Sequence, residues 1–356
     1  MNALEVFQQN LSQDECAVIF SDLSKRYLSG FSSSAGALWV GKDFSKLYLD
    51  SRYYEMACLQ KEKGLLPRSL QILPGKFSDD FRLAEKAGVL KRVLFEDLTL
   101  TVSELSSLER SYPDATFVPM GRRIEQMRLL KTKEEIGRIR ASQQLAEEAL
   151  RFVLPKIEAG RTESFVAAEL EYYMKLHGAS GPSFPTICVG GKRSSLPHGR
   201  AEDIPLEKNS FVTLDFGCIL DGYCSDMTRT FCIGKADEEM RLVYETVLCA
   251  QQAALDAVHA GVRGDAVDRA ARSVISSRGF GAFFGHSTGH GIGLAVHEAP
   301  VFSPNAAREV PAGAVLSVEP GIYLPGKFGV RIEDLVVVRE GIGENLNSFP
   351  KELLEL

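Results

Sequence analysis

Long apolar runs are missing from this chain. No stretch of the 356 residues reaches the roughly 18 consecutive apolar residues that a membrane-spanning helix needs, so we expect no membrane partner. The first 18 residues contain Glu5, Asp14 and Glu15 and no unbroken apolar run, which predicts that no signal peptide lies there.

Paired cysteines and an excess of basic residues are also missing. The seven cysteines are scattered, odd in number and without a C-x-x-C pair, which indicates reduced thiols and a cytoplasmic protein. The formal net charge is −6 with both signs interspersed, so we expect no basic face for nucleic acid. Apolar residues make up 45% and charged residues 25%, which is typical of a globular protein and argues against disorder.

The chain is too long for one hydrophobic core, since cores stop growing near about 250–300 residues. We therefore predict two domains, residues 1–123 and 124–356, with the boundary at the basic junction Gly121-Arg122-Arg123. In the first domain, short apolar runs alternate with polar or glycine-containing stretches, which predicts a smaller α/β domain. The runs lie at residues 17–20, 37–40, 46–50 and 92–95.

A helix is predicted near the start of the second domain. Thr132 and Glu135 have the spacing of a capping box, in which each side chain satisfies a free amide at the helix start. Apolar residues follow at helical spacing, and Pro155 marks the helix end.

The second domain also repeats itself. The Ala-Gly step at 159–160 recurs at 260–261, and the run 211–217 aligns with 315–321. Each half therefore runs helix, turn, helix and later a strand with a carboxylate at its end. Two such halves would face each other across a pseudo-twofold axis and bring those carboxylates together.

Four acids border strongly apolar runs in this domain, namely Asp215, Asp226, Glu319 and Glu333. A single Asp at a strand end is more often a turn former. Buried acids are costly without a partner, however, and four like charges in one place repel unless cations lie between them. Together the four acids favour a site for divalent metal over four solvated loop acids.

Three of the six histidines, His286, His290 and His297, lie within residues 285–297. Four glycines in this segment exclude a stable helix, so the 286/290 spacing is not a zinc-binding HExxH face. We expect a loop and an extended stretch in which the backbone can approach a ligand closely. The other three are His177 and His259, expected at the surface at helix ends, and His198, whose role in its loop the residues leave open.

Two other motifs overlap the same segment. Residues 285–289 fit the G-x-S-x-G elbow of serine hydrolases, but no acid stands between Ser287 and the histidines after it, as that order requires. The glycines also miss the G-x-G-x-x-G nucleotide pattern, because their last spacing is too short.

These acids and histidines, in this order, resemble the pita-bread metallopeptidases, which include methionine aminopeptidase, Xaa-Pro aminopeptidase and prolidase. The resemblance implies an α+β pita-bread fold over the second domain. It also implies two divalent metal ions, with manganese expected first and cobalt, zinc or iron as alternatives. The implied metal ligands are Asp215, Asp226, His290, Glu319 and Glu333.

Further segments resemble the proline-specific branch of the family. These are residues 197–199, 296–298, 319–323 and 331–334, together with a creatinase-type N-terminal domain at 27–37 and 49–53. The implied function is that of an Xaa-Pro aminopeptidase, which hydrolyses the bond before a proline in second position through water activated by the two metals. An Xaa-Pro dipeptidase (prolidase) is the alternative. A metal-free binding protein or amidinohydrolase of this fold would be expected to lack several of the five ligands.

The resemblance also implies roles for individual side chains. His198 and His297 would stabilise the scissile carbonyl, and Glu319 would relay a proton to the proline nitrogen. His286 and Arg331 would line the substrate pocket. A homodimer is expected, since the N-terminal domain of a second subunit could close the site.

Overall fold

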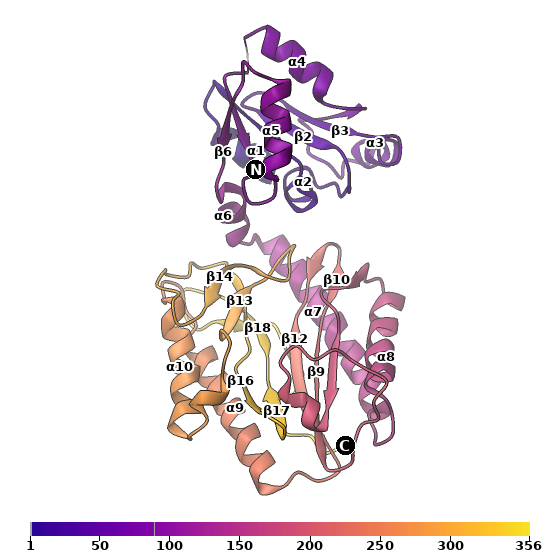
Figure 1. Ribbon diagram of the computed structural model, residues 1–356, viewed down its shortest axis with the longest axis vertical. Coiled ribbons are helices and arrows are strands. Elements are labelled where there is room, and N and C mark those ends of the chain that lie inside the picture. Colours follow the sequence, from indigo (N-terminus) through magenta and orange to yellow (C-terminus); the bar gives the residue numbers. More distant parts are fainter. Residues whose placement is uncertain (1, 89) are drawn as a thin grey trace. The chain divides into compact units, whose positions relative to one another are not determined.

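A computed structural model describes residues 2–88 and 90–356 of the chain. These residues form two compact units, one ending at Arg128 and the other running from Leu129 to Leu356 (Figure 1). None of the helices within the described ranges is long and apolar enough to cross a lipid bilayer.

The first unit is built on one mixed sheet of six strands. Its elements are α1 (Ala3–Gln9), β1 (Glu15–Ile19), α2 (Asp22–Ser29), β2 (Ala37–Gly41), β3 (Ser45–Leu49), α3 (Tyr54–Glu62), β4 (Leu70–Pro74), α4 (Ser78–Lys86), β5 (Arg92–Phe95), α5 (Val102–Ser111) and β6 (Thr116–Pro119), followed by α6 (Arg123–Leu129). The strand order is β4-β3-β2-β1-β5-β6. The predicted apolar runs form β1, β2, β3 and β5, which confirms the α/β layer. The sequence does not predict the edge strands β4 and β6, because their residues are half exposed and form no apolar run.

The second unit contains a similar succession of elements twice. The first half has α7 (Lys133–Val153), α8 (Glu163–Leu176), β7 (Gly181–Pro182), β8 (Ile187–Gly190), β9 (Ser210–Phe216), β10 (Cys218–Leu220), β11 (Tyr223–Cys224) and β12 (Met227–Ile233). The second half has α9 (Glu238–Asp256), α10 (Gly264–Ser277), β13 (Gly289–Gly291), β14 (Glu298–Phe302), β15 (Val315–Val318), β16 (Gly321–Leu324), β17 (Phe328–Arg331), β18 (Asp334–Val337) and β19 (Glu344–Asn345).

The predicted boundaries of α7 are confirmed. The Thr132 hydroxyl accepts from the Glu135 amide at 3.2 Å, and the Glu135 carboxylate accepts from the Thr132 amide at 2.8 Å, so α7 begins with a capping box. It ends at Val153, two residues before a proline. Gly178 and Gly279 follow α8 and α10 with φ of 104° and 86°, a left-handed conformation that glycine adopts without strain.

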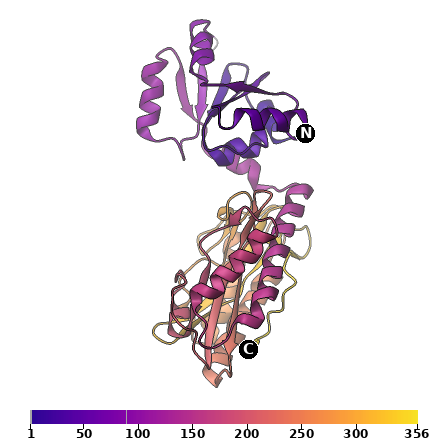
Figure 2. The ribbon, with the colours of Figure 1, turned by 90° about the vertical axis from the view of Figure 1, so that its right-hand side faces the viewer.

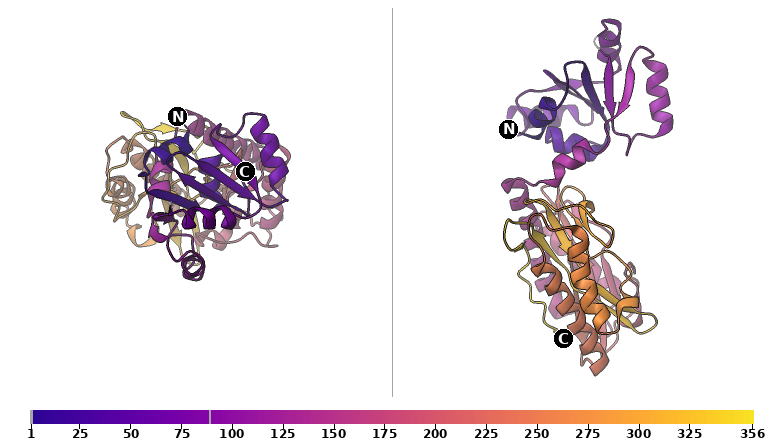
Figure 3. Two further views of the ribbon diagram at one scale, coloured as in Figure 1. Left: turned by 90° about the horizontal axis from the view of Figure 1, so that it is seen from above. Right: turned by 90° about the vertical axis from the view of Figure 1, so that its left-hand side faces the viewer.

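Each half places an antiparallel strand pair at its centre. β12 pairs with β9, which sets Thr228 opposite Asp215, and β18 pairs with β15, which sets Asp334 opposite Val318. Figure 2 shows α7 and α8 side by side on one face of this unit, and the right-hand view of Figure 3 shows α9 and α10 on the opposite face. The halves meet at Glu333, whose amide donates to the Thr228 carbonyl at 3.1 Å. This repeated α+β arrangement is the one expected for a pita-bread fold.

Apolar helix faces hold the strands in place. Val243, Val247 and Ala250 of α9 recur about one turn apart and pack in one buried cluster with Leu316 and Val336. Burying a side chain such as Val stabilises the fold by roughly 1.5–3 kcal/mol. The packing therefore fixes the strands, and with them the side chains at the strand ends.

Candidate metal centre

The four acids lie at the ends of the two central strand pairs. Asp215 lies in β9 and Asp226 directly precedes β12, its antiparallel partner. Glu319 follows β15, and Glu333 directly precedes β18. Because both pairs are antiparallel, the end of one strand lies beside the start of the next, and the acids of each pair are neighbours.

His290 joins the acids of the two halves. Its Nε2 lies 3.5 Å from Asp226 Oδ2 and 3.3 Å from Glu319 Oε1. One ligand atom each of Asp226, His290 and Glu333 lies within 4.8 Å of the other two. Such a spacing allows one cation to contact all three.

One cavity of about 460 Å³ is lined by every residue that was predicted as a metal ligand, a catalytic residue or a substrate-binding residue. The lining residues that were predicted as metal ligands are Asp215, Asp226, His290, Glu319 and Glu333. Those predicted for catalysis or substrate binding are His198, His286, His297 and Arg331. The structure therefore brings the candidate residues together, and their individual roles remain predictions.

The electrostatics of this cluster fit a cation. Burial raises the pKa of Asp226 and of Glu333 well above the ordinary carboxyl range, and the charges of neighbouring acids raise both further. Burial would also raise the pKa of Glu319, but the hydrogen bond and charge of His290 lower it to about 2. Asp215 Oδ1 and Glu333 Oε1 are buried without a hydrogen-bond partner. Buried oxygens of this kind are costly unless something binds them, so the residues present suit a hard divalent ion.

A network of donors surrounds the acids. Arg331 donates from Nη2 to Asp215 Oδ2 at 2.5 Å, from Nη1 to the Tyr323 hydroxyl at 2.6 Å and from Nε to the Thr228 hydroxyl at 3.0 Å. The Thr228 hydroxyl in turn donates to Glu333 Oε2 at 2.7 Å. The sequence assigns no role to Thr228 or Tyr323. The sequence feature that could have identified Thr228 is the alternation of side chains along a strand, which puts Thr228 on the same face as Asp226.

The histidines occupy different parts of the cavity. The His297 ring packs edge-on against His290 at 4.4 Å between centroids, and burial, followed by the charge of His290, lowers the pKa of His297. His286 Nε2 lies 2.9 Å from the Tyr323 hydroxyl, and burial lowers its pKa. His198 is exposed at the cavity wall.

Glycine lets the histidine-rich segment enter the sheet. β13 lies between β14 and β15, as the predicted extended stretch requires. A Cβ at Gly289 would lie 1.9 Å from the Ser317 carbonyl oxygen, and one at Gly291 would lie 2.5 Å from that of Ala299. Only glycine permits this approach, which places His290 beside the acids.

Comparison with known proteins identifies the family. The model of metallopeptidase family M24 matches residues 137–340, and that of the Creatinase/Prolidase N-terminal domain matches residues 8–130. An Xaa-Pro dipeptidase from Pyrococcus furiosus is 36% identical over 329 residues, covering 92% of both chains. The structure of an Xaa-Pro dipeptidase from Bacillus anthracis has a TM-score of 0.90 at 37% identity and covers 96% of this chain and 95% of its own. That of an X-Pro aminopeptidase from Thermotoga maritima has a TM-score of 0.89 at 34% identity and covers 99% and 97%.

These matches span nearly the whole chain and agree with the pita-bread fold and with the convergence of acids and histidines in one cavity. The resemblance inferred from the sequence is confirmed, and the chain belongs to metallopeptidase family M24, whose members use divalent metal ions.

Proposed function

We propose that this protein is an Xaa-Pro dipeptidase, which hydrolyses the bond between an N-terminal residue and a proline that follows it. The observation behind the proposal is the convergence of the five candidate ligands, four acids and one imidazole, with three further histidines in one cavity. The sequence alone favours an aminopeptidase, with the dipeptidase as the alternative. The relatives support that alternative better, since those from Pyrococcus furiosus and Bacillus anthracis are both named Xaa-Pro dipeptidases.

The candidate ligands divide into three groups in this proposal. Asp215 would bind one ion, His290 and Glu319 would bind the other, and Asp226 and Glu333 would contact both. When bound, divalent ions supply Lewis acidity and lower the pKa of water toward ~7. Two ions, with manganese as the first candidate, remain part of the proposal.

The chain's own residues would handle the substrate. His198 and His297 would donate hydrogen bonds to the oxygen of the scissile carbonyl, where negative charge develops. Glu319, which accepts from the Ser317 hydroxyl at 3.1 Å, would take the proton that the attacking water releases and pass it to the departing proline nitrogen. His286 and Arg331 would orient the ligand and the acids from the cavity wall.

The apolar residues of the cavity wall suit a prolyl ring. Phe184, Pro185, Ile187 and Pro197 all line the cavity. Their apolar surfaces can cover a ring that has no N–H to satisfy, whereas a peptide with a secondary amide at this point would leave its donor unpaired.

Three further features belong to the same proposal. We propose domains at residues 1–123 and 124–356, a homodimer in which a second subunit closes the site, and a cytoplasmic location. The seven free cysteines support the last of these, because reduced thiols are typical of the cytoplasm.

Peptide length distinguishes the two candidate activities. With manganese supplied, we expect kcat/KM on an Xaa-Pro dipeptide to exceed that on the matching Xaa-Pro-Yaa tripeptide by at least about tenfold, because a dipeptidase must recognise the proline carboxylate. Equal or better activity on the tripeptide would restore the aminopeptidase as the function.

A further inference from the structure

A buried ion pair lies directly behind the metal centre. Side chains alternate in direction along a strand, so Thr228 and Glu333 point into the centre while Arg229 and Asp334 point to the other face. Arg229 Nη2 lies 2.8 Å from Asp334 Oδ1, and both side chains are 1% exposed. Each charged residue is thus the immediate neighbour in sequence of a residue at the centre.

Arg229 connects the backbones of the two residues that meet at the centre. Its Nη1 donates to the Thr228 carbonyl at 3.0 Å and to the Glu333 carbonyl at 2.6 Å. On the opposite face the Thr228 hydroxyl donates to the Glu333 carboxylate at 2.7 Å. The guanidinium therefore fixes the distance between the two backbones and, through it, the place of the Glu333 side chain.

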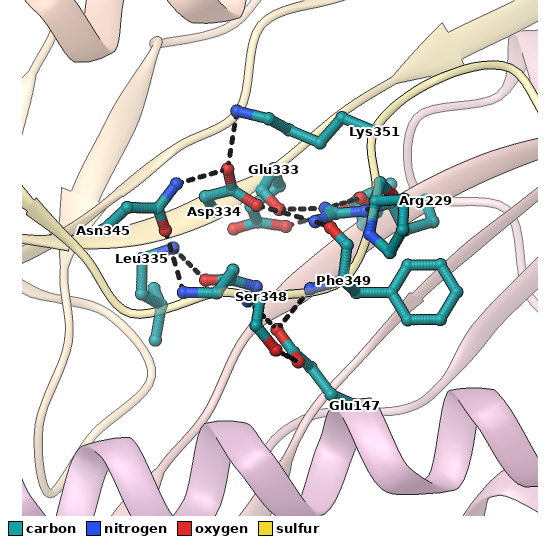
Figure 4. Close-up of polar contacts among 12 residues, drawn as sticks. Glu147, Arg229, Glu333, Asp334, Leu335, Asn345, Ser348, Phe349 and Lys351 are labelled. Carbon is teal, nitrogen blue, oxygen red and sulfur yellow. Dashed lines mark hydrogen bonds and ion pairs between the residues drawn. The ribbon is translucent and has the colours of Figure 1, made fainter.

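The C-terminal segment, residues 345–351, holds this pair from behind (Figure 4). The carbonyls of Phe349 and Pro350 accept from Arg229 at 2.9 and 3.1 Å, so all donor directions of the guanidinium are used. Lys351 Nζ lies 3.0 Å from Asp334 Oδ2. Glu147 of α7 anchors the segment in turn by accepting from the Phe349 amide at 3.1 Å.

Asp334 is held from four directions. Besides Arg229 and Lys351, the amides of Gln251 and Asn345 donate to it at 3.1 and 2.8 Å. Burial would raise its pKa, but the charges of Arg229 and Lys351 lower it to about 2. The carboxylate is therefore fully satisfied.

We propose that Arg229 and Asp334 are positioning residues for Glu333, and that residues 345–351 belong to the support of the metal centre. The inference rests on the proposed metal-binding role of Glu333. A buried ion pair is often no more stabilising than apolar residues of equal volume, so stability alone does not account for it. The fixed geometry of an arginine with every donor engaged does account for it, because a metal ligand must be held in one orientation.

The affinity of the folded protein for Mn²⁺ tests the proposal. Metal-free protein would be titrated with Mn²⁺ in competition with an indicator chelator, on variants whose folding has been checked by circular dichroism. Asp334→Asn keeps the volume and removes the charge, and we expect it to weaken Mn²⁺ binding by about 10–100-fold, the usual effect of losing an outer partner of a metal ligand. Because Asp334 does not line the substrate cavity, KM at saturating Mn²⁺ should stay within about twofold.

Lys351→Met provides a milder second variant. It removes one of the two cations that face Asp334, and its side chain is 20% exposed, so the protein should tolerate it. We expect Mn²⁺ binding to weaken by roughly 3–10-fold, below the range for a direct outer partner. Should Asp334→Asn fail to fold, Lys351→Met alone decides the question.

Tyr244→Phe is the matched control. The Tyr244 hydroxyl donates to the Lys351 carbonyl at 2.9 Å, so its loss removes one nearby hydrogen bond and keeps every bond that residues 345–351 make to Arg229 and Asp334. Its Mn²⁺ affinity should match that of the wild type. Wild-type affinity in both Asp334→Asn and Lys351→Met, or an equal loss in Tyr244→Phe, overturns the positioning role. A wild-type protein that binds no Mn²⁺ would instead overturn the proposed metal centre, and this inference with it.

Discussion

At the scale of single residues, charge compensation explains the candidate metal centre. Asp226 and Glu333 are buried and Asp215 is largely buried, and burial raises the pKa of each. Arg331 compensates Asp215 by a direct ion pair at 2.5 Å, whereas Asp226 and Glu333 mainly face other acids. These two carboxylates therefore need a cation most, in agreement with their proposed contact with both ions.

Replacing one of these two acids should show directly whether it contributes to metal binding. Asp226→Asn should bind less metal and lose at least about 100-fold in turnover. Losing an outer partner of a metal ligand already costs up to about 100-fold, and Asp226 is proposed to be a ligand itself. His177→Ala, an exposed position at the end of α8, serves as the control and should change neither. Metal content by elemental analysis and kcat would be measured side by side. Wild-type values for both in Asp226→Asn would remove this acid from the centre.

Two histidines of the cavity should respond differently to alanine. His198→Ala should keep its metal while kcat on an Xaa-Pro peptide falls by ~10²–10³, the usual cost of losing one oxyanion donor. His290→Ala should lose metal and activity together, because its imidazole lies beside Asp226 and Glu319. If His198→Ala releases metal as completely as His290→Ala, the two assignments are wrong.

Arg200 is the residue expected to bind the C-terminal carboxylate of a dipeptide. Among the described residues that line the cavity, Arg200 and Arg331 carry positive charge, and Arg331 is already bound to Asp215. Arg200→Met should lower kcat/KM on an Xaa-Pro dipeptide by roughly tenfold, the value of one charge-assisted hydrogen bond, and spare the Xaa-Pro amide. Lys192→Met, an exposed position of the 3-10 helix Gly191–Ser195 that does not line the cavity, is the control. An equal loss on dipeptide and amide would exclude carboxylate recognition by Arg200.

Site residues whose burial costs much free energy could be identified from the sequence. Acids at the ends of apolar runs carry this signal, as does a cluster of histidines among glycines. Thr228 and Tyr323 could not be identified, because hydroxyls are common in strands and only the register shows that they reach Glu333 and Arg331.

At the scale of elements, close backbone packing around β13 brings His290 to the acids. Gly289→Ala would place a methyl group 1.9 Å from the Ser317 carbonyl oxygen, so the strand must shift. We expect a loss of about 1–3 kcal/mol in the free energy of unfolding, together with weaker metal binding. Gly285→Ala, in the same segment but with no atom within 4 Å of the added Cβ, should be nearly neutral. Equal effects of the two variants on the unfolding midpoint would show that packing at Gly289 is unimportant.

Helices and strands with a capping box or a clear apolar run could be predicted, and half-exposed edge strands could not. The capping box of α7 and the apolar runs of β1, β2, β3 and β5 have local signals that the structure confirms. The edge strands β4 and β6 depend on pairing with β3 and β5, and a half-exposed segment shows no such partner in its sequence.

At the scale of the whole molecule, the repeated halves are what brings distant residues to one site. The acids in β9 and before β12 belong to one half and those next to β15 and β18 to the other, and His290 links them at 3.5 and 3.3 Å. The repeat could be predicted because similar elements recur in the sequence, and the fold could be predicted from the resemblance to the pita-bread metallopeptidases. The choice between dipeptidase and aminopeptidase could not, because it depends on how the cavity ends beyond the proline, which no single motif encodes.

The most direct test of the account is a metal titration with paired substrates. Metal-free protein, confirmed by elemental analysis, would be titrated with Mn²⁺ while kcat/KM is measured on Met-Pro and on Met-Ala. The account predicts no activity without metal, recovery as Mn²⁺ is added, and hydrolysis of Met-Pro with Met-Ala almost untouched. Full activity of the metal-free protein, or comparable kcat/KM on the two dipeptides, would contradict it.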